Sequence, residues 1–232
     1  MDHFTLDCTQ LDRWDFVNQP PVPIPSGRGR KPLSPTEASA LKASLRLGNT
    51  FGLSPLLKTA EEIVALASPP KVAVALRPPS VGTLISKALV IKFSSSSELT
   101  GALAVAASLS AVVGVLGSFG VYASTIREVG FFSTVGAGIF FNTPGAGVGG
   151  EATIILGTPT DFAGPYFGIT VGVGTGVGVA ITLLFSPTLP LSLPVVLTLM
   201  GFAFNVSAVT PTRLPVTVSI EVTNTVISGV RF

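Results

Sequence analysis

The chain has few charged side chains, and most of them lie near its start. It contains 14 lysine and arginine residues and 12 aspartate and glutamate residues in 232 positions. Only seven of these charges follow Glu98, and none lies between Asp161 and Arg213. Soluble domains carry about a quarter charged residues. The second half of the chain therefore lacks the charges of an ordinary water-facing surface, and we expect it to meet an apolar neighbour.

Cysteine and histidine are almost absent as well. A single cysteine, Cys8, excludes an internal disulfide, and the single histidine, His3, has no acid–base or metal-ligating partner at a suitable spacing. The acids of the second half are far apart in sequence: Glu128, Glu151, Asp161 and Glu221. We therefore expect no metal, no cofactor and no catalytic residue. An enzyme is the alternative that a pocket holding two of these acids within hydrogen-bond reach of each other would favour.

The sequence has neither a large net charge nor a secretory signal that would indicate a cellular compartment. The formal net charge is only +2, so attraction to nucleic acid is not expected. Residues 1–18 carry five charges and lack the basic and then apolar order of a signal peptide. The localisation stays open between association with a membrane and export by a non-classical route.

Prolines and capping residues divide the first 70 residues into a leader and two short helices. Closely spaced prolines hold the leader, residues 1–33, near polyproline II. The segment Ser34–Glu37 combines an N-cap serine, a first-turn proline and a capping-box acid, and it predicts a helix that ends near Gly48. A second serine–proline pair predicts another helix over residues 55–67. We assign both helices to a segment, residues 34–70, that packs on the following domain.

From residue 71 onward the apolar residues alternate with small or polar ones, which is typical of β-strands. In the clearest run, Phe167–Phe185, one face is valine-rich and the other is glycine-rich. As one strand this run would extend about 60 Å, so we expect it to turn back around Gly174–Gly176. Residues 71–232 are predicted to be a mainly β domain, an antiparallel β-barrel or barrel-like sandwich of about eight to ten strands in a meander or Greek key.

The alternation alone leaves open which face of the sheet points outward. A soluble barrel would bury the valine-rich face, and a membrane barrel would turn it toward lipid. In a third arrangement, another subunit or a plugging helix covers the glycine rows. Residues 99–126 also carry no charge and are long enough for a transmembrane helix, although the period of two in this segment favours strands.

The last predicted strand is similar to the final strand of bacterial outer-membrane barrels, which is amphipathic and ends on an aromatic residue. The resemblance rests on apolar residues of one parity: Val216, Val218, Ile220, Val222, Val226, Val230 and Phe232. It covers this strand alone, and it implies a lipid-facing side there.

A loop that begins at Asp161 holds the first candidates for a contact site. One interpretation is an Asx-type turn in which Asp161 bonds nearby amides and the aromatic residues cap the core. The other is an aromatic tip that contacts lipid or a partner, because amphipathic rings favour such boundaries. The candidate contact residues are Phe131, Phe132, Phe140, Phe141, Phe162, Tyr166 and Phe167.

The segment Gly145–Gly150 has the glycine spacing of a phosphate-binding loop. The residues after it are predicted to form a strand rather than a helix, so no helix N-terminus would face a phosphate. We interpret the segment as a hairpin tip.

The sequence therefore predicts a non-enzymatic β-barrel that engages a membrane or other protein subunits through apolar, glycine-rich surfaces. The expected partners are membrane lipid or an apolar ligand, together with further copies of this chain or other subunits. Two alternatives stay open: a soluble barrel that binds an apolar small molecule, and a self-assembling shell or fibre subunit.

Overall fold

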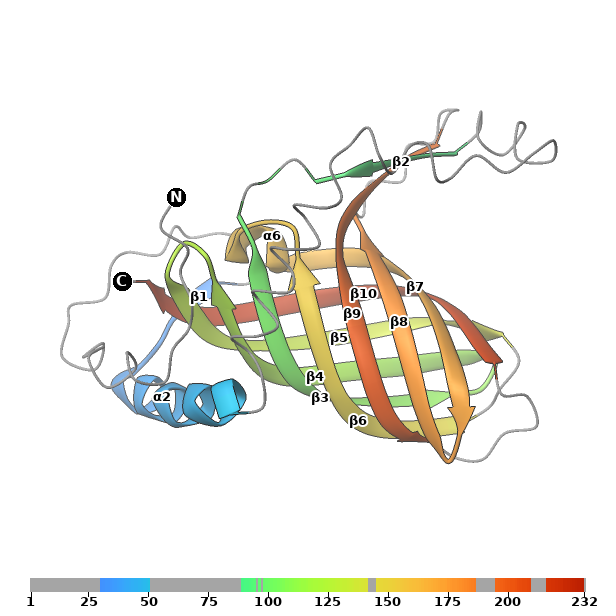
Figure 1. Ribbon diagram of the computed structural model, residues 1–232, viewed down its shortest axis with the longest axis horizontal. Coiled ribbons are helices and arrows are strands. Elements are labelled where there is room, and N and C mark those ends of the chain that lie inside the picture. The colour runs from blue at the N-terminus through green and yellow to red at the C-terminus, as the bar shows by residue number, and fades with distance from the viewer. Residues whose placement is uncertain are drawn as a thin grey trace.

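The second half of the chain forms a closed antiparallel barrel of eight strands, as the computed structural model shows (Figure 1). The structure describes residues 30–50, 89–94, 96, 98–141, 145–186, 195–209 and 216–231. Two strands and one helix precede the barrel: β1 Arg30–Pro32, α2 Pro35–Thr50 and β2 Leu89–Phe93. The barrel and its one short helix comprise β3 Thr100–Ser110, β4 Val113–Ser124, β5 Glu128–Phe141, β6 Gly145–Ile155, α6 Pro159–Phe162, β7 Gly164–Thr175, β8 Val177–Phe185, β9 Val195–Val209 and β10 Val216–Arg231.

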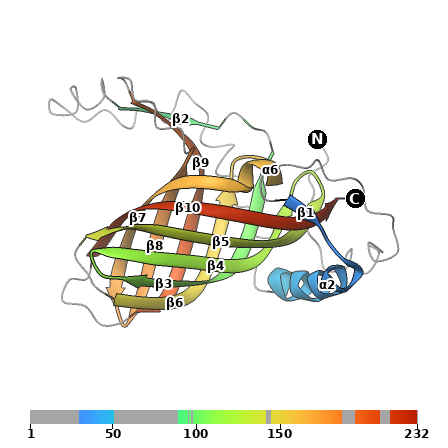
Figure 2. The same cartoon turned by 180° about the vertical axis from the view of Figure 1, so that it is seen from behind.

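The barrel is built from two Greek keys. Strands β3, β4 and β5 are consecutive antiparallel neighbours, and β6 returns to pair with β3. Strands β7, β8 and β9 repeat this pattern, and β10 returns to pair with β7. The β6–β9 and β5–β10 pairings join the two units and close the ring. Because β6 and β10 are four strands apart in either direction, they lie on opposite sides of the lumen (Figures 1 and 2).

Away from the closed end, most of the large apolar residues of the barrel strands point outward, and most of the smaller or polar residues point inward. On β10, Val222 is 60% exposed, whereas its neighbours Glu221 and Thr223 are buried. The run Phe167–Phe185 forms β7 and β8, and it turns back at Gly174–Gly176 as predicted. The valine-rich face of the alternation is therefore the outer surface, and the glycine-rich face lines the interior.

Glycine at the β7–β8 turn is required by the backbone. Gly176 has a φ of 79°, and a Cβ there would meet no atom within 4 Å. Gly176→Ala therefore tests the backbone alone, and we expect it to lower the free energy of unfolding by about 1 kcal/mol. Gly150 has equally open space without a positive φ, so Gly150→Ala should leave the stability unchanged or raise it. Urea unfolding followed by circular dichroism compares the two, and equal losses would contradict this explanation.

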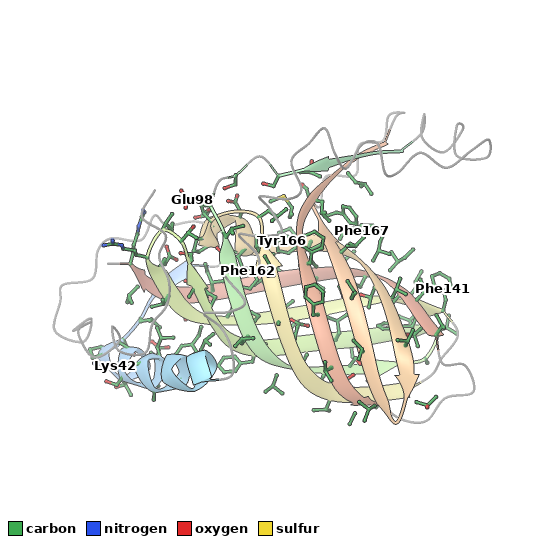
Figure 3. The ribbon with its side chains drawn as sticks, viewed as in Figure 1. Lys42, Glu98, Phe141, Phe162, Tyr166 and Phe167 are labelled. Carbon is green, nitrogen blue, oxygen red and sulfur yellow. The ribbon has the colours of Figure 1, made fainter. Side chains whose placement is uncertain are left out.

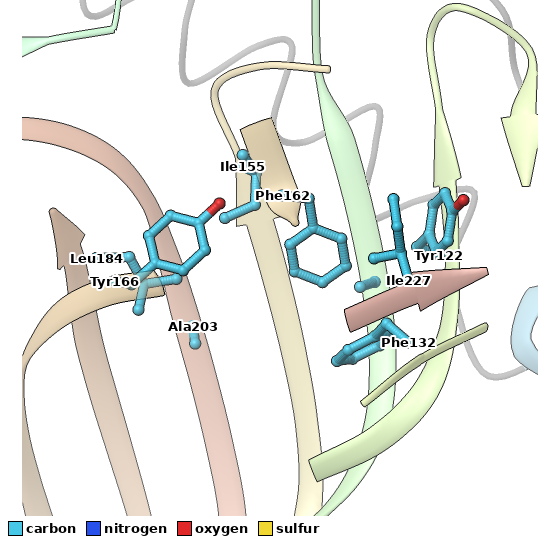
Figure 4. Packing of buried hydrophobic residues seen from close by; sticks show 9 residues of the cluster. Tyr122, Phe132, Ile155, Phe162, Tyr166, Leu184, Ala203 and Ile227 are labelled. Carbon is cyan, nitrogen blue, oxygen red and sulfur yellow. The ribbon is translucent and has the colours of Figure 1, made fainter. Parts of the chain in front are cut away.

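One end of the barrel is closed by α6 and the aromatic side chains around it. The helix begins with a capping box in which the Asp161 carboxylate accepts hydrogen bonds of 2.8 Å from both the backbone N–H and the hydroxyl of Thr158. The Phe162 ring lies 4.9 Å from that of Phe132 and 6.0 Å from that of Tyr122, measured between centroids (Figure 4). We call this end the closed end and the opposite end, where the β3–β4 and β7–β8 turns lie, the mouth.

The elements before the barrel are only partly comparable with the predictions. The capped helix is present as α2, which lies against β4, and β2 extends the sheet by pairing with β9. The end of the leader forms β1, which pairs in parallel with β10. The rest of the leader, the predicted helix over 55–67 and the predicted strand over 71–76 lie outside the described residues.

Two local interpretations of the barrel sequence are settled by the strands. Residues 99–126 form β3 and β4 rather than a transmembrane helix. Among the described residues, the structure contains no helix with both the length and the apolar character to span a membrane. The segment Gly145–Gly150 was predicted to be a hairpin tip, which is wrong: it is the first half of β6, paired with both β3 and β9.

Candidate functional site: an apolar belt around a polar lumen

Large apolar side chains cover the outside of the barrel without a gap between strands. We call the exposed large apolar residues of strands β3 to β10 the apolar belt. Every one of the eight strands contributes to it, for example through Val105, Val115, Val135, Val148, Val171, Val179, Val206 and Val222. On β10 the belt extends from Val216 to Val226. A soluble domain normally scatters such residues singly, so a belt that includes all eight strands is the feature of the outer surface that needs an explanation.

The charges of the described barrel residues lie either at the closed end or inside the lumen. Arg127, Asp161 and Arg231 are at the strand ends and turns of the closed end, as is Glu98, which Figure 3 labels. On the described strands β3 to β10, no outward-facing residue between these charges and the mouth is charged. Within the described part of the barrel, the outer surface therefore has a charged rim at the closed end and an uncharged wall.

The structure separates the predicted contact residues into inner and outer groups. Phe132, Phe162 and Tyr166 are at most 3% exposed and belong to the cluster that plugs the closed end (Figure 4). The Tyr166 hydroxyl donates a hydrogen bond to the backbone carbonyl of Asp161. These three residues cannot form an external contact surface in this conformation. This outcome corresponds to the Asx-type interpretation, in which Asp161 binds nearby amides and the aromatic residues cap the core.

The four other predicted contact residues occupy different places. Phe141 is 46% exposed at the mouth, and Phe131 stacks on exposed Phe119 on the outer wall. Phe167 is half-buried against Phe185, also on the outside. Phe140 faces inward and lines the lumen. Only part of the predicted set therefore contributes to the outer surface, because adjacent residues of a strand point to opposite faces.

The lumen holds two adjacent cavities. The outer cavity, about 190 Å³, reaches the mouth, where Ser110, Gly145 and Gly174 line it. The inner cavity, about 40 Å³, ends against Phe162 and Tyr166 at the closed end. Since α6 and its aromatic neighbours block that end, the described residues form a chamber that is closed at this end, and none of them closes it at the mouth.

Two carboxylates face each other across the lumen where the two cavities meet. Glu151 on β6 and Glu221 on β10 line both cavities, and their strands are opposite in the ring. Glu151 lies close enough for its charge to act on that of Glu221. Sequence analysis named both acids as separated candidates, and the return of β6 and β10 in the Greek keys brings them together. Glu128 and Asp161 lie apart from them, at the closed end.

Hydroxyl groups hold the two carboxylates in place. The Thr170 hydroxyl donates to Glu221 Oε1 at 3.0 Å, and Thr182 lies 2.7 Å from the Thr170 oxygen. Because the single hydrogen of Thr170 is used on Glu221, Thr182 is the donor in that pair, so the bonds form a relay toward the carboxylate. On the other side, the Thr153 hydroxyl donates to Glu151 Oε1 at 3.3 Å.

A glycine on the neighbouring strand provides the space for Glu221. A Cβ at Gly168 on β7 would lie 2.7 Å from Glu221 Cγ and 3.0 Å from its Oε1. The glycine-rich inner face therefore leaves room for a few long polar side chains that point into the lumen. The sequence does contain a signal for both acids, because each lies on the face of its strand where the alternation places small residues.

Comparison of the chain with protein-family models found no match, and comparison with curated protein sequences found none. Its class therefore follows from the fold and the site: a closed, eight-stranded Greek-key β-barrel with an apolar outer belt and a lumen that holds two buried acids among small, apolar and hydroxyl side chains.

Proposed function

We propose that this protein is a non-enzymatic membrane protein whose barrel sits in a lipid bilayer, with lipid chains around the apolar belt. The observation that carries the proposal is the orientation of the strands. Valine, isoleucine and phenylalanine side chains are exposed on all eight strands, while threonine, serine and glutamate residues lie inside. This distribution is the reverse of that in water-soluble barrels, and it matches barrels that have lipid outside and a polar interior.

The length of the strands supports a bilayer as the neighbour. The shortest belt strand, β8, has 9 residues, and the next shortest, β3 and β6, have 11 each. At about 3.3 Å per residue and a tilt of about 40°, strands of these lengths rise by roughly 23 Å and 28 Å. The apolar band of membrane barrels is about 25 Å tall. In this position the charged rim of the closed end would lie in the polar headgroup region.

A bilayer explains the belt better than the alternative neighbours do. A protein partner covers one side of a barrel, whereas the belt runs around all eight strands. A wholly apolar ligand inside the lumen would leave the remaining acceptor sites of Glu151 and Glu221, and the hydroxyl of Thr223, without a polar partner. The two alternatives are a soluble barrel filled by a ligand and a self-assembling subunit. The test must distinguish both of them from a barrel in a bilayer.

A flotation experiment tests the proposal. The full chain is refolded by dilution from urea into phosphatidylcholine vesicles, washed with high salt and alkaline carbonate, and centrifuged through a density gradient. We expect the protein to float with the vesicles after both washes, because the belt is held by lipid rather than by charge. A detergent-free, monodisperse monomer that stays at the bottom of the gradient contradicts the proposal. Regular particles in negative stain without vesicles would support self-assembly instead.

A further inference from the structure

The floor of the outer cavity is acidic and has no basic counterpart. Glu151 and Glu221 line it, and its lining within the described part of the chain includes no lysine, arginine or histidine. Buried carboxylates are normally paired with a cation or a hydrogen-bond donor, and two carboxylates in one confined space repel each other. Each of these groups accepts bonds from neighbouring hydroxyls and keeps further acceptor capacity toward the lumen. Burial disfavours the ionised form of both carboxyl groups, and the charge of Glu151 disfavours that of Glu221 further, so a cation between them would offset the cost of ionising them.

An unpartnered hydroxyl group lies at the same place. Thr223 is 5% exposed, and its Oγ1 has no hydrogen-bond partner among the described residues. It lines the inner cavity together with Glu151 and Glu221. Buried polar side chains without a partner are rare in proteins and call for an explanation. Two carboxylates and a hydroxyl are three acceptor groups, so each of the three N–H donors of a primary ammonium group can be given a different one.

The acceptor set suits an ammonium group better than a metal ion. The described residues contain no group of three or more histidine, cysteine, aspartate or glutamate side chains that could hold a metal. Calcium takes about six to eight oxygen ligands. The cavity above the acids is also partly apolar, with walls that include Ala106, Leu116, Phe140 and Ala180. Its volume of about 190 Å³ is of the size that holds a small organic molecule.

We propose that the lumen binds a small primary ammonium compound with an apolar body, an alkylammonium or arylalkylammonium ion. The ammonium group lies between Glu151 and Glu221 and donates to the Thr223 hydroxyl, and the apolar body points along the outer cavity toward the mouth. This inference goes beyond the membrane proposal and does not depend on it, because the lumen is formed within a single barrel.

Calorimetric titration of the full chain in a non-ionic detergent tests the site. The probes are hexylammonium chloride, hexanol as its neutral analogue, and calcium chloride. We expect saturable one-to-one binding of hexylammonium and at least tenfold weaker binding of hexanol. Glu221→Gln and Glu151→Gln, made separately, should each weaken hexylammonium binding at least tenfold, and Thr223→Val several-fold. Circular dichroism spectra establish that each variant is folded.

Glu98→Gln is the matched control, because it removes the same charge from a carboxylate that lies outside the lumen and binds Thr125. Its hexylammonium affinity should equal that of the unchanged protein. Equal affinities for hexylammonium and hexanol, an undiminished affinity in both lumen variants, or binding of calcium alone would each overturn the proposal. Since the titration needs no vesicles, a failed flotation with a positive titration would remove the membrane proposal and leave the binding site.

Discussion

Replacing Val222 with arginine will lower the free energy of unfolding of the vesicle-embedded barrel by about 2–4 kcal/mol. Val222 is 60% exposed near the middle of the belt on β10, so its side chain meets whatever surrounds the barrel. In a bilayer the guanidinium group would lose its hydration there. Urea titration in vesicles, followed by the shift in gel mobility between folded and unfolded barrel, measures the loss.

The same substitution distinguishes a barrel that is surrounded by lipid from one that is surrounded by water. In a barrel surrounded by water, an exposed valine can be replaced by arginine with a change within about 0.5 kcal/mol. Val222→Leu is the control for the site, since it keeps the apolar character and should leave the stability nearly unchanged in either case. If Val222→Arg is as stable in vesicles as Val222→Leu, the belt does not face lipid at this residue.

Replacing Phe162 with alanine will cost about 3–5 kcal/mol of unfolding free energy. The ring is 2% exposed and fills the closed end of the barrel between Tyr122 and Phe132. Its removal deletes the apolar contacts that hold α6 in the barrel and enlarges the inner cavity, which Phe162 lines. The loss is measured by urea unfolding in detergent, with circular dichroism as the signal.

Phe119→Ala removes the same ring from the outer wall, where it is 61% exposed and stacks on Phe131. We expect this control to cost about 1 kcal/mol, the size of a lost aromatic pair. Similar losses for the two variants would show that α6 only rests on the rim and does not plug the barrel.

Most of the strand pattern could be predicted because it is a local property of the chain. The alternation in Phe167–Phe185 and the turn at Gly174–Gly176 depend only on neighbouring residues, and both are confirmed. The capped helix α2 was predictable for the same reason. The short helix α6 was not predicted, although Thr158 and Asp161 have the spacing of a capping box.

The position of the aromatic residues was harder to predict, because a shift of one residue changes the face. Phe131 and Phe132 are adjacent, yet one lies on the outer wall and the other in the plug. Phe140 and Phe141 divide in the same way between lumen and exterior. Aromatic residues that are adjacent in the sequence therefore do not form one cluster in the barrel.

The local sequence specified that the second half is sheet, that it turns back at Gly174–Gly176, and that one face of each strand is mainly apolar and the other mainly small or polar. It did not determine which face lies outside, because a period of two is symmetrical between the faces. The closure of eight strands decided this by placing the glycine-rich face around a narrow lumen. The pairing of Glu151 with Glu221 also required the tertiary structure, because the two Greek keys place strands that are distant in sequence on opposite walls of one cavity.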